Sequence, residues 1–575
     1  MMLTILAIVT ALSVATSGDQ PTESSITPKE AMIRAHALAA SDSGRVAIVT
    51  IGKSWSGHLI EAIVLSDKVS DAANHPAFLL VSGLDGMRPS SVSIAVNAAK
   101  RLLDTPEILK DNTFYVIPCA NPDVYFAPRS KSSASGNRNH RPFDEDRDGR
   151  VDEDPPVDLD GDGVITQMRR INPPANDPPT HLPDPTDVRL MRTADATKNQ
   201  RPTHTIYTEG IDADSDGFVA EDDIGGVDID RNFPHRWPEF DPSAGSYQLS
   251  EPESQAISTF VLEHPRIVAS LVIGRWDNLV KTPDSQAKDV TGRTPLALDS
   301  GDLAIWSEMG RKWRDLSGGA RAVDVDPSGS LALWLYAHRG IPTFATQSWG
   351  RPDASPAPPL AEPVAPVTAD ATTPVSPVAQ PAEKLEDEEA TGWLAWSDRD
   401  QAGKGFIEWK SFKHPTLGDV EIGGFRPGFR SDPPLAEVSK LDDAVAGFIS
   451  ELARRQPRVV LRNVTSRESA PGIYEIEAEI VNTGWFPTAT AMGKINQQSD
   501  PVVVRLSLPK DRIQSGQRVT IVDGLAGAGG QKSFRWLVQA SPSESIVLET
   551  TWKPMGTIRA SITGDRVSEA KVVNP

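Results

Sequence analysis

The stretch that decides the fold of this chain reads Gly226-Val227-Asp228-Ile229-Asp230-Arg231-Asn232-Phe233-Pro234. Aspartates alternate with apolar residues, as they do in a short strand, and an Arg-Asn pair then precedes Phe-Pro. An arginine just past a strand presents a fixed fork of N–H donors that fits a carboxylate or a phosphate. Taken alone, the stretch is equally consistent with a solvated turn after a strand. Its meaning therefore depends on the segments around it.

The segments on both sides alternate between expected strands and expected helices. Period-two or short apolar runs predict strands at residues 45–51, 58–65, 78–81, 113–117, 267–273 and 343–349. Helical spacing of apolar residues predicts helices at residues 28–40, 90–103, 251–262, 329–336 and 435–454. Strands that alternate with helices predict an α/β fold, here a mixed sheet flanked by helices.

A chain of 575 residues is too long for one core, so two or more domains are expected. Residues 18–456 form the predicted α/β domain. Within it, residues 352–390 are rich in Pro and Ala without periodicity, and we expect a disordered linker or insertion there. Residues 457–575 show period-two runs without helices between them, which predicts a β-sandwich domain. A turn in this domain carries Trp485 and Phe486, which either pack inward or offer a surface for protein or envelope contacts.

The charge and the N-terminus bear on partners and location. The formal net charge of -20 argues against nucleic acid and anionic membranes as partners, because both require a basic face. Residues 1–17 are typical of a signal peptide, an apolar run too short to span a bilayer followed by small residues. Because this run lacks Lys and Arg, a retained anchor is the alternative. No later segment is long and apolar enough to span a membrane, so we expect an exported protein: periplasmic, cell-envelope or extracellular. The single cysteine, Cys119, lies in an apolar run and is expected to be a buried small hydrophobe.

Residues 126–225 interrupt the alternation and carry three acidic loops. Each loop has aspartate at positions one, three and five and glycine at position six, a pattern that suits calcium. None has the glutamate at position twelve that an EF-hand uses, so flanking pairs of helices are not expected. We predict an insertion ordered by calcium, with solvated acidic loops as the alternative. The candidate ligands are Asp144, Asp146, Asp148, Asp158, Asp160, Asp162, Asp212, Asp214, Asp216 and Asp223.

Three short motifs, in order along the chain, resemble those of the zinc carboxypeptidase family of metallopeptidases. The first is Gly83-Leu84-Asp85-Gly86-Met87-Arg88-Pro89, where the family reads Gly-Leu-His-Gly-x-Glu-Pro. The second is Asn121-Pro122-Asp123-Val124, where the family has an Asn-Pro-Asp-Gly turn. The third lies in residues 227–234, where the family reads Val-Asp-Leu-Asn-Arg-Asn-Phe-Pro. The resemblance covers residues 28–456 and implies zinc as the family cofactor and peptides as substrates.

The resemblance also assigns zinc and catalytic positions. The zinc-binding His and Glu of the family correspond to Asp85 and Arg88, and its third ligand, a His, corresponds to Gly274. The family's general-base Glu corresponds to Gln347. A catalytic zinc needs three ligand side chains, and hydrolysis needs a carboxylate to accept a proton from the bound water. A guanidinium, a glycine and an amide cannot fill these roles. We therefore expect degenerate zinc and catalytic positions, and whether the chain is an enzyme stays open.

The leading hypothesis is an exported, catalytically inactive relative of this family. It would bind peptide C-termini or another anionic ligand in the cleft that corresponds to the family's active site. The family's Asn-Arg pair, which grips the C-terminal carboxylate of the substrate, corresponds to Asp230 and Arg231. We expect Arg88 and Arg275 near the same pocket. An equally weighted alternative gives Arg88 only a structural ion pair, with Asp85 or Asp230.

Two other functions stay open. One is an active metallocarboxypeptidase with an atypical zinc site that includes His235 or His414. The other is a calcium-stabilised structural protein of the cell envelope, in which neither the cleft nor the arginines matter and the aromatic residues of the β-sandwich form the interaction surface.

Overall fold

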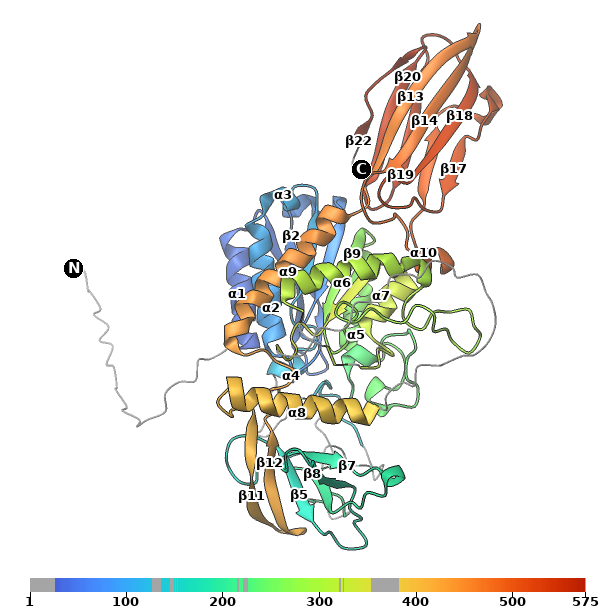
Figure 1. Ribbon diagram of the computed structural model, residues 1–575. Coiled ribbons are helices and arrows are strands. Elements are labelled where there is room, and N and C mark those ends of the chain that lie inside the picture. The colour runs from blue at the N-terminus through green and yellow to red at the C-terminus, as the bar shows by residue number, and fades with distance from the viewer. Residues whose placement is uncertain are drawn as a thin grey trace, which may run out of the picture.

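The computed structural model describes residues 26–126, 136–144, 149, 151, 154–214, 217–220, 226–319, 322–323, 325–352 and 382–573. A central α/β domain lies between a smaller β-rich part and a C-terminal β domain (Figure 1). The predicted signal peptide and residues 353–381 of the predicted linker lie outside the described residues. Among the helices that are described, none combines the length and the apolar character needed to cross a membrane.

The central sheet has six strands in the order β1-β2-β4-β3-β9-β10. The strands are β1 (Val46–Lys53), β2 (Leu59–Leu65), β3 (Ala77–Val81), β4 (Thr113–Ile117), β9 (Ile267–Ile273) and β10 (Thr343–Thr346). Neighbours among β1, β2 and β4 are antiparallel, whereas β4, β3, β9 and β10 run parallel. The predicted mixed sheet is confirmed, and the carboxyl ends of its parallel strands meet at one edge.

Helices cover both faces of this sheet. One face packs against α1 (Pro28–Ser41), α2 (Ser90–Leu103), α6 (Leu303–Ser317) and α9 (Leu435–Arg455), and the other against α5 (Pro252–Glu263) and α7 (Leu331–Arg339). The alternation of side chains along β3 makes this possible. Phe78 and Leu80 enter the core on the first face, and Leu79 and Val81 enter the core on the second. The short helices α3 (Pro106–Leu109) and α4 (Asp123–Phe126) flank β4 in the chain.

The acidic insertion contains strands of a second sheet, which the sequence analysis did not predict. The order is β11-β12-β5-β8-β6-β7. Its strands are β5 (Gln167–Ile171), β6 (His181–Pro183), β7 (Met191–Thr193), β8 (His204–Thr208), β11 (Phe406–His414) and β12 (Gly418–Phe425). Met168, Val420 and Ile422 are buried in its small core. The insertion is therefore a β subdomain completed by a distant hairpin, and not only a set of loops.

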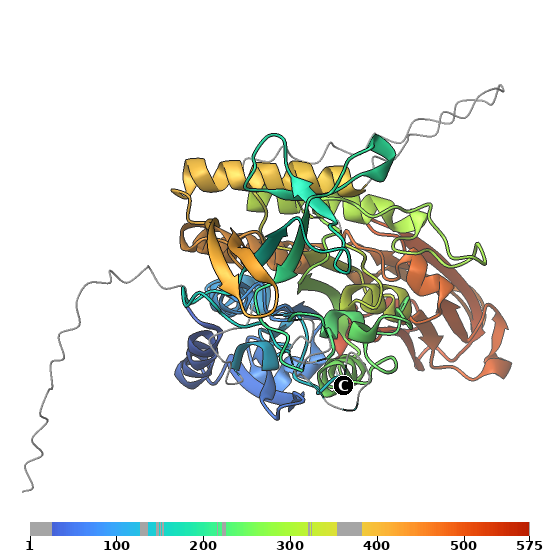
Figure 2. The ribbon, with the colours of Figure 1, turned by 90° about the horizontal axis from the view of Figure 1, so that it is seen from below.

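The helix α8 (Ala382–Asp400) lies between this second sheet and the central domain (Figure 1). Seen from below, α8 and the second sheet lie in front of the central domain (Figure 2). The start of α8 falls within residues 352–390, so the expectation of a disordered segment is wrong for the last part of that range. The Pro-rich composition ends at Pro381, and the residues that follow are mostly strong helix formers such as Ala, Glu, Lys and Leu.

The C-terminal region forms two antiparallel sheets, as predicted for a β-sandwich. Their orders are β13-β14-β18-β16 and β17-β15-β19-β20-β21, with β22 beside β20. The strands are β13 (Val459–Ala470), β14 (Ile473–Asn482), β15 (Val502–Leu506), β16 (Ile513–Ser515), β17 (Val519–Val522), β18 (Gln531–Gln539), β19 (Ser545–Trp552), β20 (Gly556–Thr563), β21 (Arg566–Val567) and β22 (Lys571–Val573). Phe486 is buried and stacks on Phe344 of the central domain, with 6.3 Å between ring centroids. This aromatic residue therefore packs at the domain junction.

Candidate functional site

The loops after β3, β9 and β10 lie together at the carboxyl edge of the central sheet. They carry Asp85, Gly274 and Gln347, and the 3-10 turn η3 (Ile229–Arg231) brings Asp230 to the same place. A Cβ atom at Gly274 would lie 3.2 Å from Asp230 Oδ2. Gln347 Nε2 lies 2.5 Å from the backbone oxygen of Arg275, the residue after Gly274. The structure thus brings these sequence-predicted residues into one site.

Asp85 and Arg88 form an ion pair inside this site. Both side chains are nearly buried, with 3% of Asp85 and 11% of Arg88 exposed. Asp85 also accepts a hydrogen bond from the backbone N–H of Met87 at 2.9 Å. With its amide nitrogen facing Asp85, Asn137 donates to the same carboxylate and accepts from Arg275 Nη1 at 3.1 Å. The structural ion pair that the sequence left open is therefore the pair with Asp85.

The Asp-rich stretch adds two buried carboxylates to the site. Asp228 is paired with Arg275 Nη2 at 2.9 Å and accepts a hydrogen bond from the backbone N–H of Asp230 at 3.0 Å. Asp230 accepts from the backbone N–H of Leu331 at 3.0 Å. Burial, reinforced by the negative charge of Asp228, raises the pKa of Asp230 to about 7. Asp230 therefore exchanges its proton near neutral pH.

Arg231, the predicted carboxylate clamp, is paired with Asp241 at 2.8 Å. The side chain of Asp241 is 34% exposed, whereas that of Arg231 is 18% exposed. Arg231 Nε is buried without a hydrogen-bond partner, and the same is true of the Nε atoms of Arg88 and Arg275. Each arginine that the sequence placed near the pocket therefore has a carboxylate partner already, and each keeps one buried donor unused.

Gln347 is held by the backbone on both sides of its amide. Its Oε1 accepts from the N–H of Val323 at 3.0 Å. Its Nε2 donates to the carbonyl oxygens of Val323 at 2.8 Å and Arg275 at 2.5 Å. The residue is only 3% exposed. An amide suits this position better than a carboxylate, because a carboxylate would face two carbonyl oxygens without a proton to share.

These residues do not fit a catalytic zinc ion. Zinc in a peptidase takes three side chains and a water molecule, but Asp85 is bound to Arg88 and Gly274 has no side chain. The two histidines considered as substitutes have other contacts. His235 packs edge-on against His338. His414 forms a hydrogen bond with the carbonyl oxygen of Gly210 in the insertion. Within the part of the chain that the structure describes, groups of three or more clustered metal-ligand side chains occur only in the acidic insertion.

Aromatic side chains from α8 and from the loop after β12 pack against this edge of the sheet. Trp349, two residues beyond Gln347, has its ring centroid 5.9 Å from that of Trp396 in α8. Trp396 in turn lies 5.3 Å from Phe429, and Trp393 lies 5.6 Å from Trp396. Neither α8 nor this cluster was predicted from the sequence. The available signal was the spacing of Trp393 and Trp396, which lie three residues apart as helix neighbours do.

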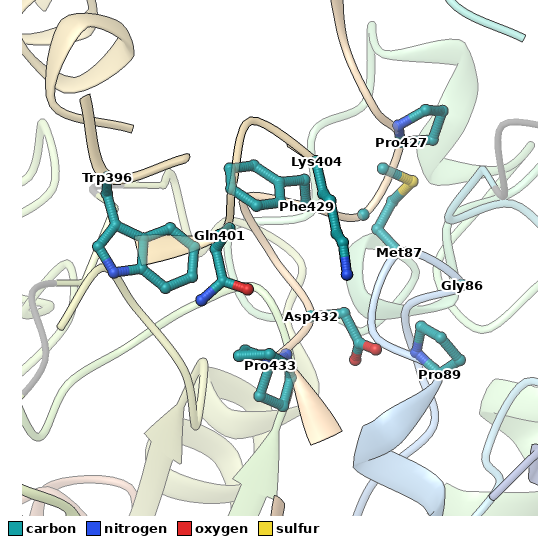
Figure 3. A pocket seen from close by; sticks show the side chains of 12 residues that line it. Gly86, Met87, Pro89, Trp396, Gln401, Lys404, Pro427, Phe429, Asp432 and Pro433 are labelled. Atoms are coloured by element: carbon teal, nitrogen blue, oxygen red, sulfur yellow. The ribbon is translucent and has the colours of Figure 1, made fainter. Parts of the chain in front are cut away.

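A cavity of about 300 Å³ lies between these aromatic side chains and the loop that carries Asp85. Figure 3 shows Met87 of that loop together with Lys404, Phe429 and Asp432 around the cavity. Asp432 accepts hydrogen bonds from the backbone N–H and the hydroxyl of Ser90 at 3.0 and 2.8 Å. These bonds connect the segment after β12 to the start of α2.

The predicted calcium ligands fall into two described clusters. Asp158, Asp160 and Asp162 form one, and Asp212 and Asp214 form the other together with Asp154, which the sequence analysis did not single out. Asp144 accepts a hydrogen bond from the backbone N–H of Gly149 at 3.1 Å. The remaining predicted ligands, Asp146, Asp148, Asp216 and Asp223, lie outside the described residues. Both described clusters have the carboxylate oxygens that a hard cation prefers.

Comparison with known proteins agrees with the sequence motifs. Residues 33–162 match the family model described as zinc carboxypeptidase, and residues 458–563 match a domain of unknown function, DUF8731. No curated protein matches the chain. The three sequence motifs, the mixed sheet and this match indicate a carboxypeptidase-like α/β fold. Residues 33–162 thus match the zinc carboxypeptidase family, in agreement with the resemblance of the sequence motifs.

Several solved carboxypeptidase structures are similar to this chain. Carboxypeptidase A from Helicoverpa armigera is 15% identical over 55% of this chain and 63% of its own, with a TM-score of 0.33. Bovine thrombin-activatable fibrinolysis inhibitor, in complex with tick carboxypeptidase inhibitor, is 15% identical over 56% of this chain and 86% of its own, with a TM-score of 0.34. A metallo-carboxypeptidase from Pseudomonas aeruginosa is 12% identical over 57% of this chain and 62% of its own, with a TM-score of 0.26. The chain thus spans less than two thirds of the Helicoverpa and Pseudomonas enzymes.

Proposed function

We propose that this protein is a catalytically inactive member of the zinc carboxypeptidase family that binds peptide C-termini, or ligands with a similar carboxylate, without hydrolysing them. The observation that carries this proposal is the buried ion pair between Asp85 and Arg88. It fills two zinc-ligand positions of the family with a cation and its counter-ion. Zinc binding to Asp85 would displace Arg88 from a nearly buried position, which is costly because it leaves a charge without its partner.

The absence of a usable base supports the same proposal. The amide of Gln347 is bound by the backbone through both its oxygen and its nitrogen. It neither accepts a proton from water near neutral pH nor has a free lone pair directed at a substrate. Within the described residues, the loops at this edge therefore have neither the ligands nor the base that peptide hydrolysis of this type requires.

The ligand class is inferred from Arg231. Its partner Asp241 is partly exposed, so an incoming carboxylate can replace it at Arg231 while Asp241 turns into water. The buried Nε of Arg231 gives a second donor for a fork-like contact with that carboxylate. A peptide C-terminus fits this exchange because its charge and shape match those of the carboxylate that it displaces.

Metal analysis and binding assays test this function together. After dialysis against zinc and then removal of free metal, we expect no bound zinc and no release of C-terminal residues from peptides. A peptide library with free C-termini should bind more tightly than the same library with amidated C-termini. The matched control is Arg231→Ala, which should remove that difference. One zinc per chain with peptide hydrolysis would support the active-enzyme alternative and contradict the proposal.

We also propose that the loop from Asp158 to Gly163 binds calcium in an exported protein. Its three carboxylates offer oxygens within 4.8 Å of one another, and the N-terminal sequence favours export to a compartment where calcium suits such loops. A chelator should lower the melting temperature of the wild-type protein. If Asp160→Asn responded to the chelator as strongly as the wild type, the loop would not be the calcium site.

A further inference from the structure

Asp154 is a buried carboxylate in the first part of the insertion. The residue is 0% exposed. Its Oδ1 accepts hydrogen bonds from the backbone N–H groups of Ala213 at 2.7 Å and Asp214 at 3.1 Å. Its Oδ2 is buried and has no hydrogen-bond partner. A buried carboxylate oxygen without a donor is costly unless a cation neutralises it.

Two more carboxylates lie close to that of Asp154 and complete a cluster. Asp212 and Asp214 each bring an oxygen to the cluster, and the three oxygens lie within 4.8 Å of one another. Asp212 also has a buried oxygen without a hydrogen-bond partner. Calcium binds its ligands at about 2.3–2.6 Å, so oxygens on opposite sides of one ion lie up to about 5 Å apart. The spacing of the cluster therefore fits a single ion.

The backbone holds the two halves of this cluster side by side. The N–H of Val157 donates to the carbonyl oxygen of Glu209 at 2.9 Å. A Cβ atom at Gly210 would lie 3.5 Å from Pro156 Cα, which shows how closely the two segments approach. The carboxylates of Asp154 and Asp212 are thus brought together by the fold itself, which reduces the ordering that an ion would have to impose.

We propose that Asp154, Asp212 and Asp214 form a binding site for one divalent cation, and that their all-oxygen donor set selects calcium. The site is shared between two segments of the insertion that are far apart in the chain, so the ion ties residue 154 to residues 212–214. Zinc is a poor match because the cluster has no nitrogen or sulfur ligand. The site does not depend on the inactive zinc positions, nor on the separate loop that begins at Asp158.

The test is calcium binding to the full chain, measured by isothermal titration after removal of metal. Asp154→Asn is the informative variant, because its amide oxygen still accepts from Ala213 and Asp214 while the charge is lost. Asp160→Asn is the matched control in the other cluster. We expect each single variant to bind one calcium fewer than the wild type, and the double variant to bind two fewer. Calcium should also protect the wild-type insertion from limited proteolysis, and Asp154→Asn should lose that protection.

The outcomes separate this proposal from the others. Unchanged calcium stoichiometry in Asp154→Asn, with one calcium lost in Asp160→Asn, would overturn the shared site and leave the loop site intact. A lower melting temperature of Asp154→Asn than of the wild type in chelator, together with an unchanged calcium stoichiometry, would assign Asp154 a purely structural role and overturn the proposal. Tighter binding of magnesium or zinc than of calcium in the same titration would overturn the choice of metal.

Discussion

Arg88 lies three residues after Asp85 and forms a nearly buried ion pair with it. By the family motif, the same two positions would hold two zinc ligands. A guanidinium thus supplies positive charge at the place where family members hold the metal. The carboxylates of Asp85, Asp228 and Asp230 are all buried at this edge of the sheet, so this charge offsets a repulsion that would otherwise oppose folding.

Replacing Arg88 with Ala should therefore destabilise the protein strongly. Asp85 would stay buried without its partner, which costs about 3–5 kcal/mol in comparable buried pairs. Urea unfolding followed by tryptophan fluorescence measures the loss. Arg311→Ala is the control, because its pairs with Glu308 and Asp315 lie on an exposed helix surface and should contribute less than about 1 kcal/mol. Equal losses in the two variants would mean that the buried pair has no special role.

Restoring the family's base should not restore activity. In Gln347→Glu, a carboxylate would face the carbonyl oxygens of Val323 and Arg275, which now accept from the amide. Leaving these buried groups unsatisfied should cost about 1–3 kcal/mol per group. The melting temperature and a peptide hydrolysis assay test this together. Hydrolysis by this variant at normal stability would show that the site retains more catalytic capacity than its geometry indicates.

Freeing Arg231 should strengthen ligand binding. Asp241→Asn removes the negative charge that is paired with the Arg231 guanidinium. The asparagine oxygen can still accept the hydrogen bond from the backbone N–H of Ser243. We expect about tenfold tighter binding of peptides with free C-termini, which corresponds to about 1.4 kcal/mol. Amidated peptides should gain nothing. If both peptide forms gained equally, the exchange of carboxylates at Arg231 would be wrong.

Asp230 should make stability depend on pH. Burial, together with the charge of Asp228, raises its pKa to about 7, so the folded protein holds a proton that the unfolded chain releases near pH 4. Stability from this group therefore falls as pH rises from about 4 to about 7 and is constant above that. Asp230→Asn keeps an oxygen for Leu331 and removes the charge. The melting temperature of this variant relative to wild type should rise across that window. A constant difference at all pH values would contradict the raised pKa.

The central domain could be predicted from sequence because its signals are local. The strands β4 and β9 and the helix α2 have the predicted bounds, since β4 and β9 are continuous apolar runs buried on both faces. The convergence of Asp85, Gly274 and Gln347 followed from the motifs, and the parallel strands explain it. The helix α6 was missed even though Trp306, Met309 and Trp313 have helical spacing.

The second sheet and the partners of the charged residues could not be predicted in the same way. The strand β5 reads Gln-Met-Arg-Arg-Ile, which has little apolar alternation, and its stability comes from pairing with β12 far along the chain. Likewise, nothing local to Arg231 indicates that Asp241 neutralises it, and nothing in the loop pattern indicates that Asp154 joins Asp212. These choices depend on which segments the tertiary fold brings together.

The pairing of β5 with β12 also determines when the second sheet can be completed during translation. Arg169 and Glu421, which form an ion pair across these strands, are 252 residues apart in the chain. At about 5–20 residues per second, a ribosome needs roughly 13–50 seconds to deliver the second partner after the first. During that interval β5 presents an open edge, because the strand that pairs with it there, β12, has not yet been made. The nascent chain is therefore most exposed to aggregation and to chaperones before the hairpin of β11 and β12 emerges.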